Sequence, residues 1–119
     1  MEVINMAKDD YHVIVYQILA YLYQCLKKGA AVESKNIENN CKYFQINKDY
    51  WTYILYHMQY SGLIEGIVFI DVDNLDLPIP TQLDSCRITP TGIEHLCDNT
   101  FMEKAKRFLK DVKEIVPFT

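Results

Sequence analysis

Apolar residues recur at helical spacing from the start of the chain, over residues 8–28. The main stripe consists of Tyr11, Ile14, Ile18, Leu22 and Cys25, and it is widened by Val15, Leu19 and Leu26. This periodicity predicts a long helix. Lys27 and Lys28 suit the negative end of the helix dipole, and Gly29 is well placed to end the helix. Because its apolar surface is broad, we expect burial on more than one side, in the core or in the core plus a dimer contact.

Two shorter helical patterns follow, joined by a brief turn. Ser34 can cap a helix over 34–44, and Asn47 can cap a helix over 48–60. The apolar positions are Ile37, Cys41 and Phe44 in the first, and Trp51, Ile54, Leu55 and Met58 in the second. Ile46 precedes the second cap and can pack on Trp51 as a hydrophobic staple. Residues 34–61 are therefore predicted to form a helix-turn-helix.

The spacing of apolar residues changes after Gly62. Leu63–Ile70 is rich in β-branched and aromatic residues and predicts a strand, and a second, shorter strand is expected over Cys86–Thr89. A polar excursion with two prolines, Asp71–Ser85, separates them. A hairpin over 63–89 directly after a helix-turn-helix is the sequence outline of a winged helix.

Residues 90–116 predict a pair of C-terminal helices. Thr89 before Pro90 favours a helix from Pro90 to Asp98, although Thr91 and Glu94 also fit a capping box. A second helix is expected from Thr100, capped by Thr100 and Glu103, to about Val116. Its apolar seam consists of Phe101, Ala105, Phe108, Val112 and Ile115. These residues can pack against the first helix of the same chain, or they can pair with a second copy to form a homodimer through residues 100–116.

The predicted fold class is mainly α with a small β-hairpin (α+β). We expect a single winged helix-turn-helix domain over 1–119, with 1–7 as an N-terminal extension and a C-terminal pair of helices. The chain has no stretch that meets the length and apolar character of a membrane span, and acidic residues precede the first apolar run where a signal peptide needs basic ones. A cytoplasmic protein without membrane contact is the expectation.

Charge changes the functional picture. Twelve Lys and Arg against sixteen Asp and Glu leave a net charge of −4, which weakens any interpretation that needs a uniformly basic surface. Residues 63–86 hold five carboxylates and no Lys or Arg. An acidic wing repels the DNA backbone beside a recognition helix.

The sequence lacks the common motifs for catalysis or cofactor binding. The four glycines are too dispersed for a phosphate-binding loop. The three histidines lack metal-ligand spacing, and Asp71, Asp73 and Asp76 do not complete a calcium loop. The cysteines, Cys25, Cys41, Cys86 and Cys97, lie beside apolar residues without a CxxC pair and are expected to be reduced core thiols. We expect no enzyme activity, no metal and no cofactor.

Candidate contact residues lie on the outer side of the predicted helix over 48–60. Thr52 and Gln59 can offer hydrogen bonds to base edges, and Lys48 a phosphate contact, to which Lys35 and Lys42 would add. Tyr53, Tyr56 and Tyr60 instead form a stripe that suits a protein interface or packing beneath the wing. The candidates for contact with nucleic acid or a partner are Lys35, Lys42, Lys48, Thr52, Tyr53, Tyr56, His57, Gln59 and Tyr60.

From about Lys8 onward the chain resembles the YjcQ family of small proteins from Gram-positive bacteria and their phages. The resemblance rests on Asp9–Tyr11, Ile18–Leu22, Tyr50–Trp51, Gly62–Gly66, Ile88–Ile93 and Lys104–Leu109. It implies a winged-helix fold without an assigned activity. The function expected is a winged-helix binding module, in the first place a regulator that binds double-stranded DNA. The alternative is a protein-interaction module, a phage-encoded modulator of a host complex, that binds its protein partner through the tyrosines of the third helix.

Overall fold

The computed structural model describes residues 6–117, so most of the predicted N-terminal extension, residues 1–5, lies outside the described part. The helices are α1 (Tyr11–Lys28), α2 (Lys48–Tyr60), α3 (Pro90–Asp98) and α4 (Thr100–Asp111), with 3-10 turns at Ser34–Asn36 and Leu83–Ser85. The strands are β1 (Ile64–Glu65), β2 (Val68–Ile70), β3 (Ile79–Thr81) and β4 (Arg87–Ile88). The predicted fold class, mainly helical with small antiparallel pairing and compatible with a winged helix, is confirmed.

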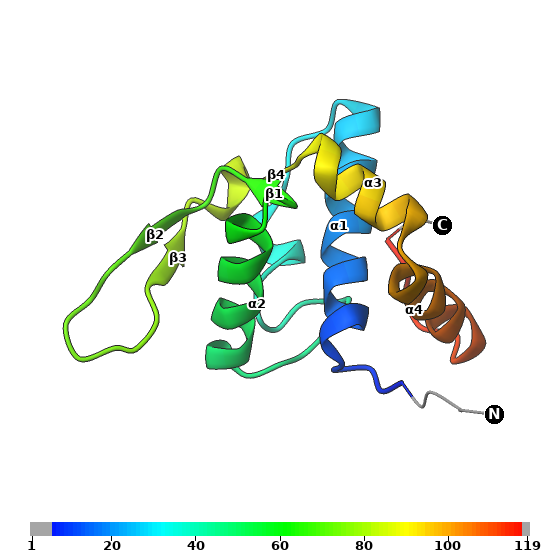
Figure 1. The fold of residues 1–119 in the computed structure, drawn as a ribbon, viewed down its shortest axis with the longest axis horizontal. Coiled ribbons are helices and arrows are strands. Elements are labelled where there is room, and N and C mark those ends of the chain that lie inside the picture. Colours follow the sequence, from blue (N-terminus) through cyan, green and yellow to red (C-terminus); the bar gives the residue numbers. More distant parts are fainter. Residues whose placement is uncertain (1–5, 118–119) are drawn as a thin grey trace.

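Helix α1 is the centre of the fold. It contacts α2, α3, α4 and β4, and Figure 1 shows it between α2 on one side and the C-terminal helices on the other. Every residue from Val13 to Leu22 is buried, as expected for a helix covered on more than one side. Gly29 ends the helix in the left-handed conformation at φ 66°, as its position predicts.

The predicted helix over 34–44 is wrong. Only a single 3-10 turn forms there, and the chain then bends back on itself. Backbone hydrogen bonds join Ile46 N–H to the Asn39 carbonyl at 2.9 Å and Cys41 N–H to the Phe44 carbonyl at 2.9 Å, while the Asn39 side chain donates to the Ile46 carbonyl at 3.3 Å. Asparagine competes with the helical hydrogen-bond pattern in this way. The helix-turn-helix predicted for 34–61 therefore lacks its first helix.

Helix α2 has the predicted bounds and cap. The Asn47 side chain accepts a hydrogen bond from Tyr50 N–H at 2.8 Å. Trp51 is only 5% exposed, and its indole N–H donates to the Ile37 carbonyl at 2.8 Å. The loop before α2 is thus tied to the helix through a buried side chain, although that loop is not helical.

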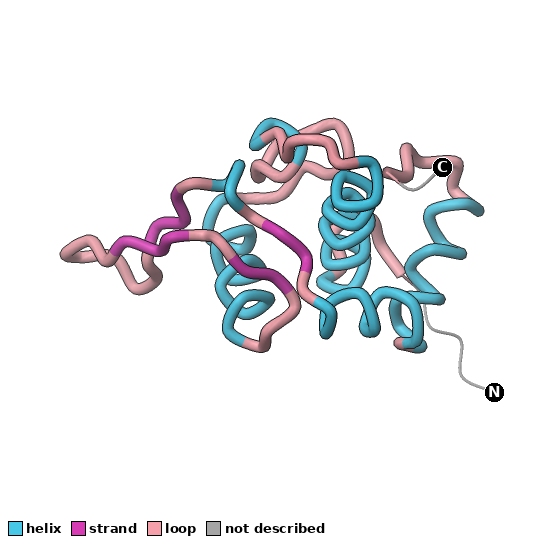
Figure 2. The backbone as a smooth tube through the Cα atoms, turned by 90° about the horizontal axis from the view of Figure 1, so that it is seen from above, coloured by secondary structure: helices cyan, strands magenta, loops and turns pink. Residues whose placement is uncertain are grey.

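The wing has two short antiparallel pairs in place of one continuous hairpin. At its base β1 pairs with β4, with Ile64 opposite Ile88. Further out β2 pairs with β3, with Phe69 opposite Pro80. The predicted strand over 63–70 is interrupted at Gly66 and Ile67, and β3 lies within the polar excursion Asp71–Ser85, for which no strand was predicted. Figure 2 shows the outer pair extending away from the helices.

Glycine is required where the strand is interrupted. Gly66 has φ 99°, and a Cβ at this position would overlap the Ser85 carbonyl oxygen. A side chain is excluded both by the backbone conformation and by the close approach of the neighbouring segment. The break at Gly66 therefore separates the base of the wing from the projecting pair.

The C-terminal helices begin as predicted but differ in their caps and seam. The Thr89 hydroxyl accepts from Gly92 N–H at 2.9 Å, so α3 starts at Pro90 and not two residues later. Asn99, and not Thr100, caps α4. The chain leaves α4 after Asp111, and Lys113 adopts φ 58°, so the helix is shorter than predicted.

Helix α4 packs on α1, one of the two alternatives for its seam, but through a shifted stripe. The buried residues are Met102, Ala105 and Leu109, whereas the predicted seam residues Phe101, Val112 and Ile115 are 40%, 40% and 56% exposed.

Of the four cysteines only Cys97 is exposed, which corrects the expectation that all four are core thiols.

Candidate functional site

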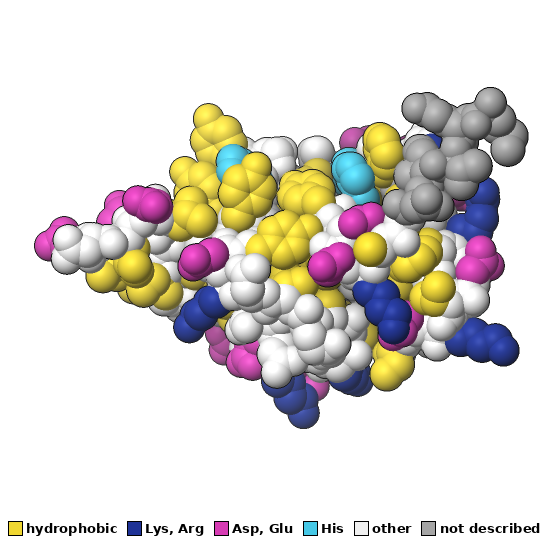
Figure 3. Space-filling view, turned by 90° about the horizontal axis from the view of Figure 1, so that it is seen from below, with side chains coloured by type: hydrophobic (Ala, Val, Ile, Leu, Met, Phe, Trp, Pro, Cys, Tyr) yellow, Lys and Arg dark blue, Asp and Glu magenta, His cyan; other side chains and the backbone are white. Residues whose placement is uncertain are grey.

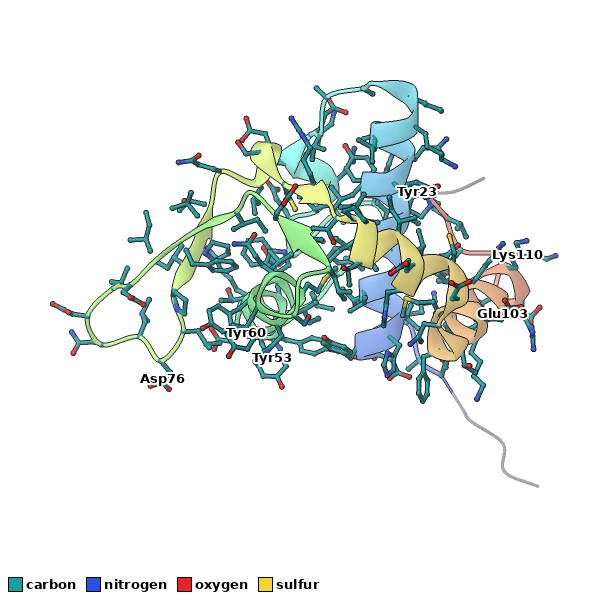
Figure 4. The ribbon with its side chains drawn as sticks, turned by 45° about the horizontal axis from the view of Figure 1, so that its top comes forward. Tyr23, Tyr53, Tyr60, Asp76, Glu103 and Lys110 are labelled. Atoms are coloured by element: carbon teal, nitrogen blue, oxygen red, sulfur yellow. The ribbon has the colours of Figure 1, made fainter. Side chains whose placement is uncertain are left out.

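The outer surface of α2 carries a cluster of aromatic rings, which we call the tyrosine face: Tyr11, Tyr50, Tyr53, His57 and Tyr60. These residues and Ser61 line a shallow hollow of about 510 Å³. Figure 3 shows apolar and histidine side chains gathered on this side of the molecule, and Figure 4 shows Tyr53 and Tyr60 on the same side of α2. Tyr53 and Tyr60 are exposed, whereas Tyr50, His57 and Tyr11, which comes from the start of α1, are half-buried.

Exposure within the tyrosine face is greatest for two of its tyrosines. Tyr53 is 47% exposed and Tyr60 is 79% exposed. The Tyr53 ring lies 4.4 Å from the His57 ring, centroid to centroid. The tyrosine face therefore exposes a large aromatic area to solvent, and some of its rings contact one another.

Tyr56 has a different role from its neighbours. Its ring meets Phe69 of the wing edge to face at 5.4 Å between centroids and lies parallel to Tyr60 at 6.2 Å. The side chain is half-buried. Of the two roles proposed for the tyrosine stripe, packing beneath the wing applies to Tyr56, while Tyr53 and Tyr60 stay available.

The phenols of Tyr11 and Tyr50 are both half-buried, and that of Tyr50 is a hydrogen-bond donor. The Tyr50 hydroxyl donates to the Asp9 carbonyl at 2.7 Å. Burial raises the pKa of Tyr50, and the negative charges of Asp9 and Asp10 raise it further. Burial also raises the pKa of Tyr11. Both phenols therefore stay neutral well above neutral pH.

Two residues expected to read DNA bases are engaged elsewhere. Thr52 is buried at 8% exposure, so the prediction that it points outward is wrong. The reason is that α2 is covered on two sides, by α1 and by strands of the wing. Gln59 is half-buried, and its side chain makes two hydrogen bonds with the backbone of Ile67.

The three candidate lysines lie apart from the tyrosine face hollow. Lys48 is exposed in the first turn of α2. Lys35 forms an ion pair with Glu33 at 3.7 Å, and the Lys42 ammonium lies over the Tyr43 ring at 5.1 Å. None of the three lines the hollow. The structure brings together Tyr53, His57 and Tyr60 but not the basic candidates.

Sequence reasoning missed a second exposed group on the wing. Val68, Ile70 and Ile79, which we call the wing outer face, are 43%, 50% and 38% exposed. The period-2 alternation of Val68 and Ile70 about Phe69 was a usable signal for two opposite faces. Ile79 had no such signal, since Pro78 and Pro80 surround it and argue against a strand.

The described residues supply neither a metal site nor a membrane span. Within residues 6–117, no three His, Cys, Asp or Glu side chains gather to hold a metal ion. Over the same range, no helix combines the length and apolar character that crossing a bilayer requires.

Comparison with known proteins identifies a matching family. The family model described as YjcQ protein matches residues 16–115, from the first turns of α1 to beyond the end of α4. Comparison with curated proteins and comparison with solved structures each gave no match.

Proposed function

The chain belongs to the YjcQ family, and from the surface of its wing and α2 we propose that it is a protein-interaction module whose tyrosine face contacts the partner. The observation that carries the proposal is the exposure of Tyr53 and Tyr60, 47% and 79%, on a helix whose other sides are covered. Tyrosine is enriched at the centre of protein interfaces because its ring buries a large area while its hydroxyl keeps a hydrogen bond.

The polar side chains support the same proposal. A DNA reader needs free hydrogen-bond groups on the helix that enters the major groove. Thr52 is buried, and both ends of the Gln59 carboxamide are bonded to Ile67. The exposed side of α2 that remains is the aromatic tyrosine face, and aromatic side chains are better suited to contact a protein surface than to form hydrogen bonds with base edges.

Charge argues in the same direction. Residues 63–86, which include the whole projecting pair of strands, contain five carboxylates and no Lys or Arg. DNA affinity rises with the number of phosphates that a protein neutralises, so an acidic wing beside α2 opposes binding. A protein partner with basic residues would instead be attracted.

DNA binding is the second candidate function. The observation in its favour is an exposed helix beside a hairpin, with Lys48 exposed in the first turn of that helix. Winged helices dock on DNA through such a helix, but an argument from shared fold is associational. In this alternative the protein is a DNA-binding regulator, with Lys48 on phosphate.

The two candidates are separated by affinity capture and duplex selection with the same variants. The double variant Tyr53→Ala/Tyr60→Ala removes the exposed rings, and Leu26→Ala/Ile115→Ala removes two side chains that are 50% and 56% exposed elsewhere. We expect the double tyrosine variant, but not the control, to lose at least about tenfold in partner recovery. Recovery that is unchanged by the tyrosine variant, with salt-dependent selection of one duplex, would favour DNA binding.

A further inference from the structure

The outer pair of strands has two faces of different character. In the β2–β3 register Phe69 lies opposite Pro80, and Ile70 lies opposite Ile79. Phe69 contacts Tyr56 of α2, and Pro80 is buried. Since side chains alternate along a strand, Val68, Ile70 and Ile79 point to the opposite side, away from α2.

That opposite side is unusually apolar for an exposed hairpin. An antiparallel pair with one face on the core normally presents polar residues on the other. Here three β-branched aliphatic side chains are 38–50% exposed, and Val72 and Leu75 extend the group toward the tip at 41% and 54%. A group of exposed apolar side chains on a projecting element is typical of an interaction site.

Charge identifies the kind of partner. Asp71, Asp73 and Asp76 lie in the exposed segment after β2 and alternate along the sequence with Val72 and Leu75, and Figure 4 shows Asp76 in the loop beyond the outer pair of strands. Two copies of the chain in contact through their wings would bring these carboxylates together, and the repulsion opposes self-association. A basic partner would gain from the same charges.

We propose that the wing outer face binds a segment of another protein that presents aliphatic side chains interspersed with Lys or Arg. The aliphatic side chains cover Val68, Ile70 and Ile79, and the cations lie beside Asp71, Asp73 and Asp76. This site is distinct from the tyrosine face and goes beyond the function proposed above. The partner is recognised by apolar contact and selected by charge.

Two synthetic eight-residue peptides test this proposal against the full chain. One alternates Val with Lys, and the other alternates Val with Glu. Titration into the ¹⁵N-labelled protein, followed by amide chemical shifts, should show the Val–Lys peptide shifting residues 68–81. We expect its affinity to exceed that of the Val–Glu peptide by at least about tenfold at low salt, and the difference to shrink as salt is added.

Matched variants assign the binding to the wing. Ile70→Thr/Ile79→Thr keeps the β-branched shape and should weaken Val–Lys binding at least about tenfold. Leu26→Thr/Ile115→Thr and Tyr53→Ala/Tyr60→Ala should leave it unchanged, so failure here is separable from failure of the proposed function. Equal binding of both peptides, shifts outside the wing, or self-association in sedimentation that Ile70→Thr/Ile79→Thr abolishes would overturn the proposal.

Discussion

The side chain of Gln59 binds both backbone groups of Ile67. Its amide nitrogen donates to the Ile67 carbonyl at 2.8 Å, and its amide oxygen accepts from Ile67 N–H at 3.0 Å. Ile67 follows the break at Gly66, where neither strand pair supplies its partners. The last turn of α2 therefore replaces a missing neighbour strand, and the position of the wing relative to the tyrosine face depends on this contact.

Replacing Gln59 with Leu should loosen the wing. Ile67 is 4% exposed, so its backbone groups lose two hydrogen bonds without easy access to water. We expect a loss of about 1–3 kcal/mol in the free energy of unfolding, measured by urea denaturation, and faster amide exchange at residues 64–70. Gln24→Leu on α1 is the matched control. An equal, small loss in both variants would show that the Gln59 contact contributes little.

Trp51 tests the orientation of α2. Its ring is buried, and its N–H bonds the Ile37 carbonyl at 2.8 Å. Trp51→Ala should cost about 3–5 kcal/mol of unfolding free energy, and Trp51→Phe, which keeps much of the ring, should cost clearly less. A loss below about 1 kcal/mol for Trp51→Ala would contradict the burial and place the tyrosine face differently.

Gly66 and Gly29 allow two reasons for requiring glycine to be compared, the backbone conformation and the lack of space for a Cβ atom. Both have positive φ, but a Cβ at Gly29 meets open space, whereas at Gly66 it overlaps the Ser85 carbonyl. We expect Gly29→Ala to cost about 1 kcal/mol, and Gly66→Ala to cost about 1–3 kcal/mol more because the backbone of the wing must move. Thermal unfolding of the two variants makes the comparison. Equal costs would mean that Ser85 moves freely.

Two histidines should make stability depend on pH. Burial lowers the pKa of His12, although Asp10 opposes the shift, and burial together with nearby His12 lowers the pKa of His95. His12 also stacks on Phe101 of α4 at 4.3 Å between ring centroids. His12 of α1 thus contacts α4, and His95 belongs to α3.

The sign follows from proton binding. In the unfolded chain both groups titrate near the ordinary value of 6.5, so on acidification the unfolded state binds protons first. The stabilisation from the two neutral imidazoles is complete above that value and is lost as pH falls below it. Urea denaturation from pH 7.5 to 5.5 should show this fall, and His12→Gln/His95→Gln should flatten it. An unchanged slope in the double variant would exclude these groups as its cause.

The sequence predicted the elements whose signals are local. The periodicity of α1, the Asn47 cap of α2 and the Thr89–Pro90 start of α3 each depend on residues within one or two turns. The non-helical course of 34–44 could not be read in this way, since the apolar residues Ile37, Cys41 and Phe44 are buried as a helix would bury them. In this segment hydrogen bonds of the Asn39 backbone and side chain with Ile46 replace the helical pattern.

The candidate site was predictable only in part. The exposure of Tyr53 and Tyr60 follows from the spacing of the buried stripe, but the burial of Thr52 depends on the second cover that the wing provides. The bond from Gln59 to Ile67 joins α2 to the wing, and the strand at Ile79–Thr81 forms by pairing with β2. These are tertiary effects that no local pattern encodes.

Photo-crosslinking in cells that produce the protein tests the central claim most directly. Benzoylphenylalanine in place of Tyr60 puts a reactive ring on the tyrosine face, and the same group in place of Ile115, which is 56% exposed, is the control. We predict a discrete crosslinked species at Tyr60 alone that protease removes and nuclease does not. A nuclease-sensitive species, or equal crosslinking at both positions, would contradict the account.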